Sequence, residues 1–498
     1  MNPTRPNFEL TETLVHRFAT PPDPWHAFLR LAHLPHTVFL DSAAKDPHLG
    51  RYSYIAASPF EVLVGQGNSL SCRQREGTSL DAPYAEVLRT CDPPLRVAQE
   101  RIALWSAERI PDLPPFQGGA AGYFGYNLGR QLQSIPTTRF DEFSVPEMVL
   151  GVYDWTLAFD HTESAAYLIA HGFPETSPSG RRTLAASRIR RVLELLGATN
   201  PRPAPLPSGN PIPIDALAPT SPVPAVEGVV SNFSRVDYLD AVEQGIEYIR
   251  AGDVFQVNLS QRLLYPIEDS PTDLYQRLRT RNPAPFAGYF HTGDAVIASS
   301  SPEQFLTLDD GVVVTRPIKG TRPRGYSAFD DPYQGAALFE SEKDRTENVM
   351  IVDLLRNDLS KVAEPGSVEV PRLFEIERHP TVYHLVSEIR ALLRPGQGAF
   401  DLLEAAFPGG SITGAPKIRA MEIIAELEPT DRGAYCGSMG WIGFDGAMST
   451  NILIRTVTMA HGWLQFPVGG GVVAMSSPSA EYEETLNKAA GIVRALKK

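Results

Sequence analysis

A proline-rich segment in the middle of the chain sets the strongest limit on how this sequence can fold. Nine prolines lie between Pro201 and Pro224, with Ser, Ala and Gly among them. Because such a segment lacks backbone donors and apolar bulk, we expect an extended connector here and not part of a core. The sequence therefore divides into an N-terminal region of residues 1–200, a linker of residues 201–229 and a C-terminal region of residues 230–498.

Composition and charge exclude several classes of protein. The 498 residues are 43% hydrophobic and 21% charged, which is ordinary for a globular chain of about two to four domains. No apolar run is long enough to cross a bilayer, and the N-terminus lacks the apolar stretch of a secretory signal. Three widely spaced cysteines give no disulfide framework and favour the cytoplasm. The net charge of −13 argues against nucleic-acid or membrane binding, but not against an anionic small substrate.

Short apolar runs and helical patterns mix along the chain. The sequence predicts strands at residues 37–40, 52–55, 166–170, 254–259, 295–298 and 312–315. It predicts helices at residues 180–196, 334–359, 401–406, 415–427 and 479–496. Strands and helices do not alternate regularly, so we expect an α+β fold and not a doubly wound sheet.

Two pairs of acidic residues recur at helical spacing. Asp344 and Glu347 share the predicted inward face of one helix, and Glu481 and Glu484 repeat the spacing near the start of the last helix. Each pair alone is explained by a solvated helix start, where the helix dipole favours acids. Two converging pairs would instead suit magnesium, which prefers oxygen ligands. Periodicity leaves both interpretations open.

Three further segments allow either a plain or a functional interpretation. The basic stretch from Thr315 to Gly325 is a solvated loop or an anion site in which Lys319 could be a nucleophile. Small residues at 409–417 form an ordinary helix start or leave backbone donors free for a carboxylate. Gly469–Gly471 is a turn or bulge, or a point where a ligand approaches the backbone closely.

Together, and in this order, these strings resemble the chorismate-utilising enzymes. The resemblance runs from Ser234 to the C-terminus, and its most telling strings are Ser-Pro-Glu at 301–303, Pro-Ile-Lys-Gly-Thr at 317–321, Lys-Asp-Arg-Thr-Glu-Asn at 343–348 and Glu-Tyr-Glu-Glu-Thr at 481–485. It implies the chorismate-binding enzyme fold, with antiparallel sheets packed as a sandwich and helices on the outside. Residues 1–200 resemble, less tightly, the N-terminal region of anthranilate synthase component I.

The resemblance also implies roles for single residues. Glu347 and Glu484 match the magnesium ligands, with Asp344 and Glu481 acting through metal-bound water. The residues that match substrate-binding groups are Gly320, Thr321, His384, Ser411, Thr413, Gly414, Tyr435, Arg455, Gly469, Gly470, Gly471 and Lys488. Under the resemblance, the acid pairs become Mg²⁺ ligands and the triple glycine a ligand contact.

Lys319 selects one branch of the family. Anthranilate synthases carry Ala at this position, and isochorismate and salicylate synthases place a basic Lys where this chain has Gln256. Aminodeoxychorismate synthases have Lys and Gln at these two positions, as here. The implied reaction converts chorismate and ammonia to 4-amino-4-deoxychorismate, for 4-aminobenzoate and folate synthesis. Lys319 would be the nucleophile and Glu303 the general acid.

A nucleophilic lysine must be neutral, although a free lysine is almost wholly protonated at pH 7. Three nearby cations, Arg316, Arg322 and Arg324, together with burial, are expected to lower the pKa of Lys319. The acids near the metal are expected to oppose them. The competing mechanism is direct addition of ammonia at C2 of the ring.

The source of ammonia depends on whether the chain contains a glutaminase motif of its own. No Gly-x-Cys-x-Gly glutaminase elbow surrounds any cysteine, so the resemblance implies a separate glutaminase subunit or free ammonia. Anthranilate synthase component I is the alternative enzyme. A catalytically silent partner that binds chorismate or tryptophan is the alternative of another class.

A tryptophan pocket is a further expectation from the resemblance. In relatives, bound tryptophan is contacted by residues matching Ser42, Leu49, Gly50, Arg51, Tyr52, Pro285, Phe286 and Ala287. Plain sandwich core explains the same residues equally well.

Two departures from the family pattern are visible. The family has Asp where this chain has Met475 and Ser477, and Gly-Arg where it has Ser360 and Lys361. Neither departure falls on a proposed ligand, although each can alter local loop structure and metal affinity.

Overall fold

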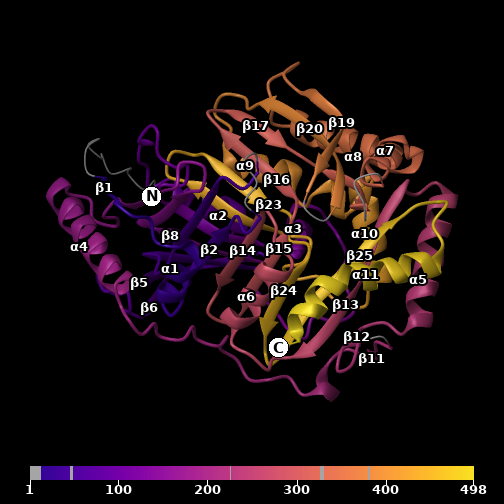
Figure 1. Ribbon diagram of the computed structural model, residues 1–498, viewed down its shortest axis with the longest axis horizontal. Coiled ribbons are helices and arrows are strands. Elements are labelled where there is room, and N and C mark those ends of the chain that lie inside the picture. The colour runs from indigo at the N-terminus through magenta and orange to yellow at the C-terminus, as the bar shows by residue number, and fades with distance from the viewer. Residues whose placement is uncertain (1–12, 45–48, 225, 326–329, 380–381, 498) are drawn as a thin grey trace.

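The computed structural model describes residues 13–44, 49–224, 226–325, 330–379 and 382–497. Their strands form two large antiparallel sheets (Figure 1). The first sheet runs β1 (Leu14–Arg17), β10 (Ala165–Ala170), β9 (Trp155–Asp160), β3 (Tyr52–Ala56), β2 (Val38–Asp41), β14 (Phe286–His291), β15 (Val296–Ser301), β24 (Thr456–Ala460), β25 (Trp463–Val472), β13 (Gln256–Pro266), β12 (Val230–Ser231) and β11 (Ser221–Pro222), with β21 (Gly414–Ala415) beside β13.

The second sheet runs β18 (Ile318–Pro323), β20 (Val382–Leu392), β17 (Val312–Thr315), β16 (Gln304–Asp309), β23 (Met448–Asn451), β22 (Ser438–Gly443), β7 (Gly119–Phe124), β8 (Met148–Tyr153), β4 (Glu61–Gln66), β5 (Ser69–Arg75) and β6 (Tyr84–Thr90), with β19 (Glu369–Arg378) beside β20. The α-helices are α1 (Pro24–Leu31), α2 (Pro94–Ile102), α3 (Gly129–Leu132), α4 (Pro178–Leu196), α5 (Arg235–Ala251), α6 (Pro271–Arg281), α7 (Asp331–Glu340), α8 (Glu342–Ser360), α9 (Ala399–Ala406), α10 (Lys417–Leu427) and α11 (Pro478–Leu496).

The two sheets pack face to face. One buried cluster joins Tyr54 and Phe290 of the first sheet to Tyr123 and Trp441 of the second. Residues alternate along each strand, so the neighbours of these residues point to the outer faces. The α+β sandwich predicted from the sequence is confirmed.

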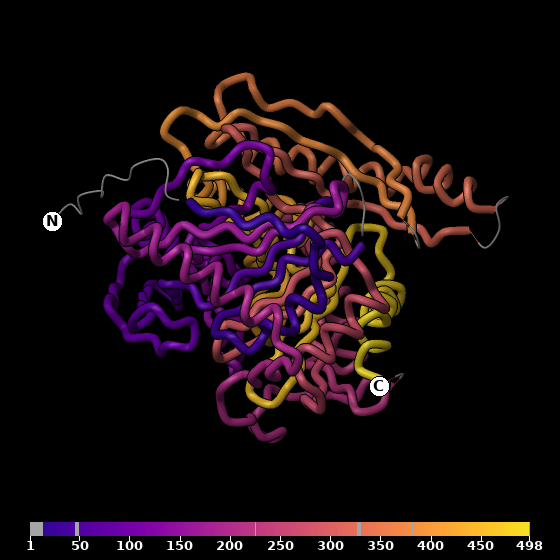
Figure 2. The backbone as a smooth tube through the Cα atoms, turned by 60° about the vertical axis from the view of Figure 1, so that its left-hand side comes forward, coloured from indigo at the N-terminus to yellow at the C-terminus, as the bar shows by residue number. Residues whose placement is uncertain are grey.

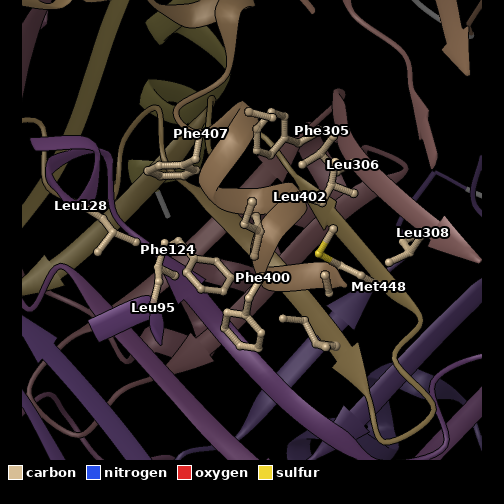
Figure 3. Close-up of a cluster of buried hydrophobic side chains, with 14 of the residues drawn as sticks. Leu95, Phe124, Leu128, Phe305, Leu306, Leu308, Phe400, Leu402, Phe407 and Met448 are labelled. Atoms are coloured by element: carbon tan, nitrogen blue, oxygen red, sulfur yellow. The ribbon is translucent and has the colours of Figure 1, made fainter. Parts of the chain in front are cut away.

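Helices cover both outer faces. On the first sheet, Phe28 of α1, Tyr275 of α6 and Ile492 of α11 belong to one buried cluster. On the second sheet, Leu95 of α2 and Phe400 of α9 pack with strand residues, as Figure 3 shows. The segment that carries β17 to β20 and α7 extends beyond the body of the sandwich (Figure 2).

Both sheets contain strands from either side of the proline-rich linker. Strand β2 pairs with β14, and β7 pairs with β22, so the N-terminal and C-terminal regions share hydrogen-bonded sheets. The linker runs along the outside of the molecule (Figure 1), where the indole of Trp463 donates to the Ile212 carbonyl at 2.8 Å. It forms no helix or strand before residue 214, but the expectation that it stays outside the core was wrong for its later part. Ser221–Pro222 form strand β11 of the first sheet, and Leu217, Val223 and Val229 are buried in core clusters. The linker thus separates the regions in sequence and not in the sheets.

The predicted helix at 334–359 is two helices. Ser341 takes an extended conformation, and its side chain accepts a hydrogen bond from the Asp344 amide at 3.3 Å, which starts α8. The other long predicted helices end within a few residues of the observed ones. In the described part of the chain, no helix combines the length and apolarity needed to span a membrane.

Two buried histidines predict sensitivity to acid. Burial lowers the pKa of His36 to about 3 and that of His171 to about 4. The unfolded chain takes up these protons near pH 6.5, so stability falls as pH drops from 6.5 toward 4, by up to about 1.4 kcal/mol per pH unit for each histidine. Thermal midpoints measured across this range should decrease, and His171→Gln should flatten the slope. An unchanged slope in the variant would contradict the assignment.

Candidate active site

Lys319 and Glu303 contact the same serine. Lys319 lies on β18, and its Nζ donates to the Ser411 carbonyl at 2.9 Å. Ser411 belongs to the 3-10 turn Gly410–Ile412. Glu303 is buried in the bend between β15 and β16, where it hydrogen-bonds the Ser411 side chain and the backbone of Ile318. An amine and a carboxyl group from different strands are thus held at one point.

Burial favours the uncharged form of both groups. It lowers the pKa of Lys319, helped by the charge of Lys488 and opposed by Glu347, Glu303 and Glu484. It also raises the pKa of Glu303. A neutral amine is the nucleophilic form, and a protonated carboxyl group is the form that can act as an acid.

The three arginines near Lys319 do not act on it as the sequence predicted. Each one pairs with acids: Arg316 with Glu377 and Glu388, Arg322 with Asp344, and Arg324 with Asp331. Since their charges are balanced locally, burial is the main cause of the lowered pKa. The prediction that these arginines depress the lysine pKa was wrong.

The two predicted acid pairs lie near each other. Burial raises the pKa of Glu347 on α8, and the charge of Glu484 on α11 adds to that effect. The Glu347 Oε1 atom is buried without a hydrogen-bond partner, and the ammonium of Lys343 lies 3.8 Å from it. Asp344 is turned to Arg322, at 3.0 Å. A buried carboxylate oxygen left without a donor fits a cation ligand.

The acids of α11 are held by neighbouring polar groups. Glu481 accepts from the Ser476 hydroxyl at 2.6 Å, and Lys488 lies 2.7 Å from Glu484. Within the described residues, no cluster of three or more His, Cys, Asp or Glu side chains is arranged to hold a metal ion. The oxygen donors suit Mg²⁺ in type, but lysines now balance their charge.

Gly469–Gly471 lies inside strand β25 and forms neither a turn nor a bulge. The three glycines pair in regular register with residues 258–260 of β13. A Cβ at Gly471 would lie 2.2 Å from Gln256 Nε2, and one at Gly470 would lie 3.1 Å from Glu484 Oε1. Because these glycines have no side chains, Glu484 of α11 can approach the sheet closely at Gly470.

Arg455 is a half-buried cation. Burial lowers its pKa, and its guanidinium makes no hydrogen bond or ion pair among the described residues. Nearby, the Thr321 hydroxyl and His384 Nδ1 are 2.9 Å apart. Burial, with the charges of His379 and Arg455, lowers the pKa of His384 to about 3. An unpaired, half-buried guanidinium beside a neutral imidazole can take an anionic group.

The remaining predicted residues make contacts within several neighbouring segments. Lys488 Nζ donates to the Gly469 carbonyl at 2.8 Å, and Thr413 Oγ1 donates to the Gly409 carbonyl at 3.0 Å. Gly320 and Gly414 have φ of +89° and +146°, and Tyr435 is buried close to Arg432. A Cβ at Gly414 would lie 2.2 Å from the Gln256 carbonyl oxygen.

Two residues that the sequence did not indicate donate hydrogen bonds to the carbonyls of the 3-10 turn Gly410–Ile412. Asn258 Nδ2 donates to the Ser411 carbonyl at 2.8 Å, the same oxygen that Lys319 contacts. Arg432 donates to the Ile412 carbonyl at 3.1 Å. The only signal in the sequence was the position of Asn258 in an otherwise strand-like apolar run.

A second site is a cavity of about 520 Å³ between the two sheets. It is lined by most of the residues predicted for tryptophan, namely Ser42, Leu49, Arg51, Tyr52, Pro285, Phe286 and Ala287. Gly50 is the predicted residue that does not line it. These residues therefore line an open cavity between the sheets.

The family model described as chorismate binding enzyme matches residues 55–494. The chain belongs to the chorismate-binding enzymes. Aminodeoxychorismate synthase component 1 of Salmonella typhimurium is 40% identical to it over 482 residues, covering 95% of this chain and 97% of the relative. Anthranilate synthase component 1 of Thermus thermophilus is 38% identical over 481 residues, covering 95% of both chains.

The fold of this chorismate-binding enzyme is also found among solved structures. Anthranilate synthase component I from Streptococcus pneumoniae matches with a TM-score of 0.73 and 30% identity, covering 90% of this chain and 93% of that one. Similarity over nearly the whole length agrees with two sheets that include strands from both sides of the linker.

The family departures lie at the edge of the site. Met475 is 89% exposed, whereas its neighbour Ser476 donates to Glu481. Lys361 and Lys417 both pair with the buried Asp358, at 2.9 and 2.6 Å. Ser476, which lies between the two substituted positions Met475 and Ser477, thus contacts one of the predicted acids, Glu481.

Proposed function

We propose that this enzyme is an aminodeoxychorismate synthase component, which converts chorismate and ammonia to 4-amino-4-deoxychorismate. The observation that carries the proposal is the amine of the half-buried Lys319, held on the Ser411 carbonyl beside a buried Glu303. The name of the Salmonella relative supports it. Anthranilate synthase, the alternative, is expected to have Ala at the lysine position.

In the proposed first step, the neutral amine of Lys319 attacks C2 of the chorismate ring. The N–C2 bond forms as the ring double bonds shift and the C4–O bond breaks. Glu303 gives its proton to the departing hydroxyl, which leaves as water, and the lysine nitrogen passes a proton back to the Glu303 carboxylate. Ammonia then adds at C4 as the C2–N bond breaks, and a proton passes from the ammonia nitrogen to the lysine nitrogen, which releases Lys319 as the neutral amine. The enolpyruvyl group stays on the ring.

The proposed substrate contacts use the unpaired donors of the site. Arg455 would bind one chorismate carboxylate, since burial makes an unpaired guanidinium a strong anion site. Tyr435 and the backbone of Gly469–Gly471 would line the same carboxylate, and Thr321 with His384 would face the ring. Lys488 would offset negative charge near the acids.

Mg²⁺ is the proposed cofactor, with Glu347 and Glu484 as ligands and Asp344 and Glu481 acting through water. The ion would neutralise the charge of the ring carboxylate. In a calorimetric titration without substrate, Glu347→Gln and Glu484→Gln should each weaken Mg²⁺ binding by about 10-fold or more. Glu426→Gln is the matched control, since Glu426 lies on α10 and accepts from the Tyr248 hydroxyl at 2.6 Å, and it should bind as the wild type does. Equal affinities for all four proteins would refute the ligand assignment.

Product analysis separates the two enzyme functions. Chorismate, Mg²⁺ and an ammonium salt should give 4-amino-4-deoxychorismate, identified by chromatography and mass spectrometry. Anthranilate as the product would refute the proposal in favour of the alternative. Absence of any turnover, with chorismate still bound, would favour the silent binding partner.

The ammonia is proposed to come from a separate glutaminase subunit. Support comes from the cysteines, because Cys72 and Cys436 are buried, and burial raises the pKa of each thiol to about 12. Thiols with such pKa values are poor nucleophiles. Cys91 is exposed, but it does not lie in a Gly-x-Cys-x-Gly glutaminase motif.

Tryptophan is the proposed ligand of the second cavity. A ligand that binds only the native state stabilises it by about 2.7 kcal/mol at one hundred times its Kd. Millimolar tryptophan should therefore raise the thermal midpoint, whereas glycine should not. Copurified tryptophan would be independent support. No change in the midpoint, and no tryptophan in the purified protein, would rule this ligand out.

A further inference from the structure

The ion pair between Arg432 and Glu428 is fully buried, because each side chain is 3% exposed. Arg432 donates to both carboxylate oxygens, at 2.9 and 2.6 Å. Desolvating two charges usually offsets most of their attraction, so an apolar pair of the same size would often be as stable. This pair therefore needs a reason other than stability.

The contacts of the pair give that reason. Besides Glu428, the Arg432 guanidinium donates to the Ile412 carbonyl at 3.1 Å and to the Asn258 carbonyl at 2.8 Å. Glu428 accepts from the amide and hydroxyl of Ser260, at 2.8 and 2.9 Å. One planar guanidinium thus joins the 3-10 turn to strand β13 and makes two hydrogen bonds to Glu428, four in all, whereas an ammonium has three donors.

The same two segments hold the acceptor of the lysine. Ser411 precedes Ile412 in the turn, and its carbonyl accepts from Lys319 at 2.9 Å and from Asn258 Nδ2 at 2.8 Å. Arg432 therefore holds two residues that position this carbonyl. One is Ile412, the next residue in the turn, and the other is Asn258, whose side chain donates to the carbonyl. A movement of the turn would move the amine.

We propose that Arg432, aligned by Glu428, is a positioning residue that fixes the Ser411 carbonyl and, through it, the Lys319 amine. This inference rests on the proposed function for its kinetic consequence, but not for its structural one. A misplacement of about 1 Å away from the reacting atoms can lower a rate by about 100-fold.

The main test variant is Arg432→Lys, which keeps the charge opposite Glu428. Its kcat should fall by about 10- to 100-fold while the KM for chorismate changes little. The matched control is Arg188→Lys, because Arg188 is also 3% exposed, pairs with buried Asp154 at 3.1 Å and donates to the Thr78 carbonyl. The control should lose thermal stability and keep its kcat.

A second measurement reads the amine without turnover. Labelling of Lys319 by acetic anhydride, followed by mass spectrometry, should change by at least about threefold in Arg432→Lys, the smaller end of what one hydrogen bond contributes. The labelling of Arg188→Lys should match the wild type. If the wild type proves to make another product, the proposed function fails, and this labelling still tests the positioning role.

Three outcomes would overturn the positioning role. Unchanged kcat and labelling in Arg432→Lys would do so. So would an equal loss of kcat in both arginine variants. If Arg432→Lys does not fold, Glu428→Gln replaces it with the same expected changes, and failure of both to fold while Arg188→Lys folds would make the pair a folding element instead.

Discussion

Lys319→Ala should reduce the formation of 4-amino-4-deoxychorismate by at least about 10³-fold, because removal of a covalent nucleophile costs up to about 10⁶-fold in known cases. Chorismate binding should stay within a few-fold of the wild type, since the proposed carboxylate contacts lie on Arg455 and the β25 backbone. Steady-state kinetics with ammonium salt measure the first quantity, and calorimetry measures the second.

Lys361→Ala serves as the matched control for the nucleophile. Lys361 is half-exposed, and its ammonium lies 2.9 Å from Asp358. Its variant should turn over as the wild type does. An Lys319→Ala enzyme with unimpaired turnover would remove the nucleophile role, and direct addition of ammonia at C2 would then explain the reaction better.

Glu303→Gln should lower kcat by about 10²- to 10⁴-fold, the usual contribution of a positioned general acid. The amide keeps the size of the side chain and can still hydrogen-bond Ser411, but it has no proton to give to the leaving hydroxyl. Burial raises the pKa of Glu303, so the native group keeps its proton to higher pH than an exposed glutamate would.

Rapid-quench kinetics locate the defect of this variant. The step that breaks the C4–O bond should slow by the same factor as kcat, while the KM for chorismate changes little. If covalent capture of chorismate by Lys319 proceeds at the wild-type rate in Glu303→Gln, the general acid is another group.

Local patterns predicted much of this molecule. The strands at 37–40, 52–55 and 166–170 were found because apolar residues and turn residues alternate over short distances. The inward position of Asp344 followed from helical periodicity, and its side chain is buried. The residues matched to tryptophan contacts came from the resemblance, and most of them enclose the cavity.

Long-range contacts could not be predicted from those patterns. The arginines around Lys319 pair with acids 7 to 72 residues away in sequence, and such distances carry no periodic signal. Both sheets contain strands from the two sides of the linker, and this depends on which strands pair, which local patterns do not specify. The break at Ser341 was missed because a capping serine resembles any polar residue on a helix surface.

Mass spectrometry of the Lys319 peptide tests the central claim most directly. The wild-type enzyme is incubated with chorismate and Mg²⁺ but without ammonia, quenched, digested and compared with Lys319→Ala. We predict an adduct of chorismate minus one water on the peptide that contains Lys319, which disappears when ammonium is added before quenching. A wild-type enzyme that forms 4-amino-4-deoxychorismate but never carries this adduct would contradict the account.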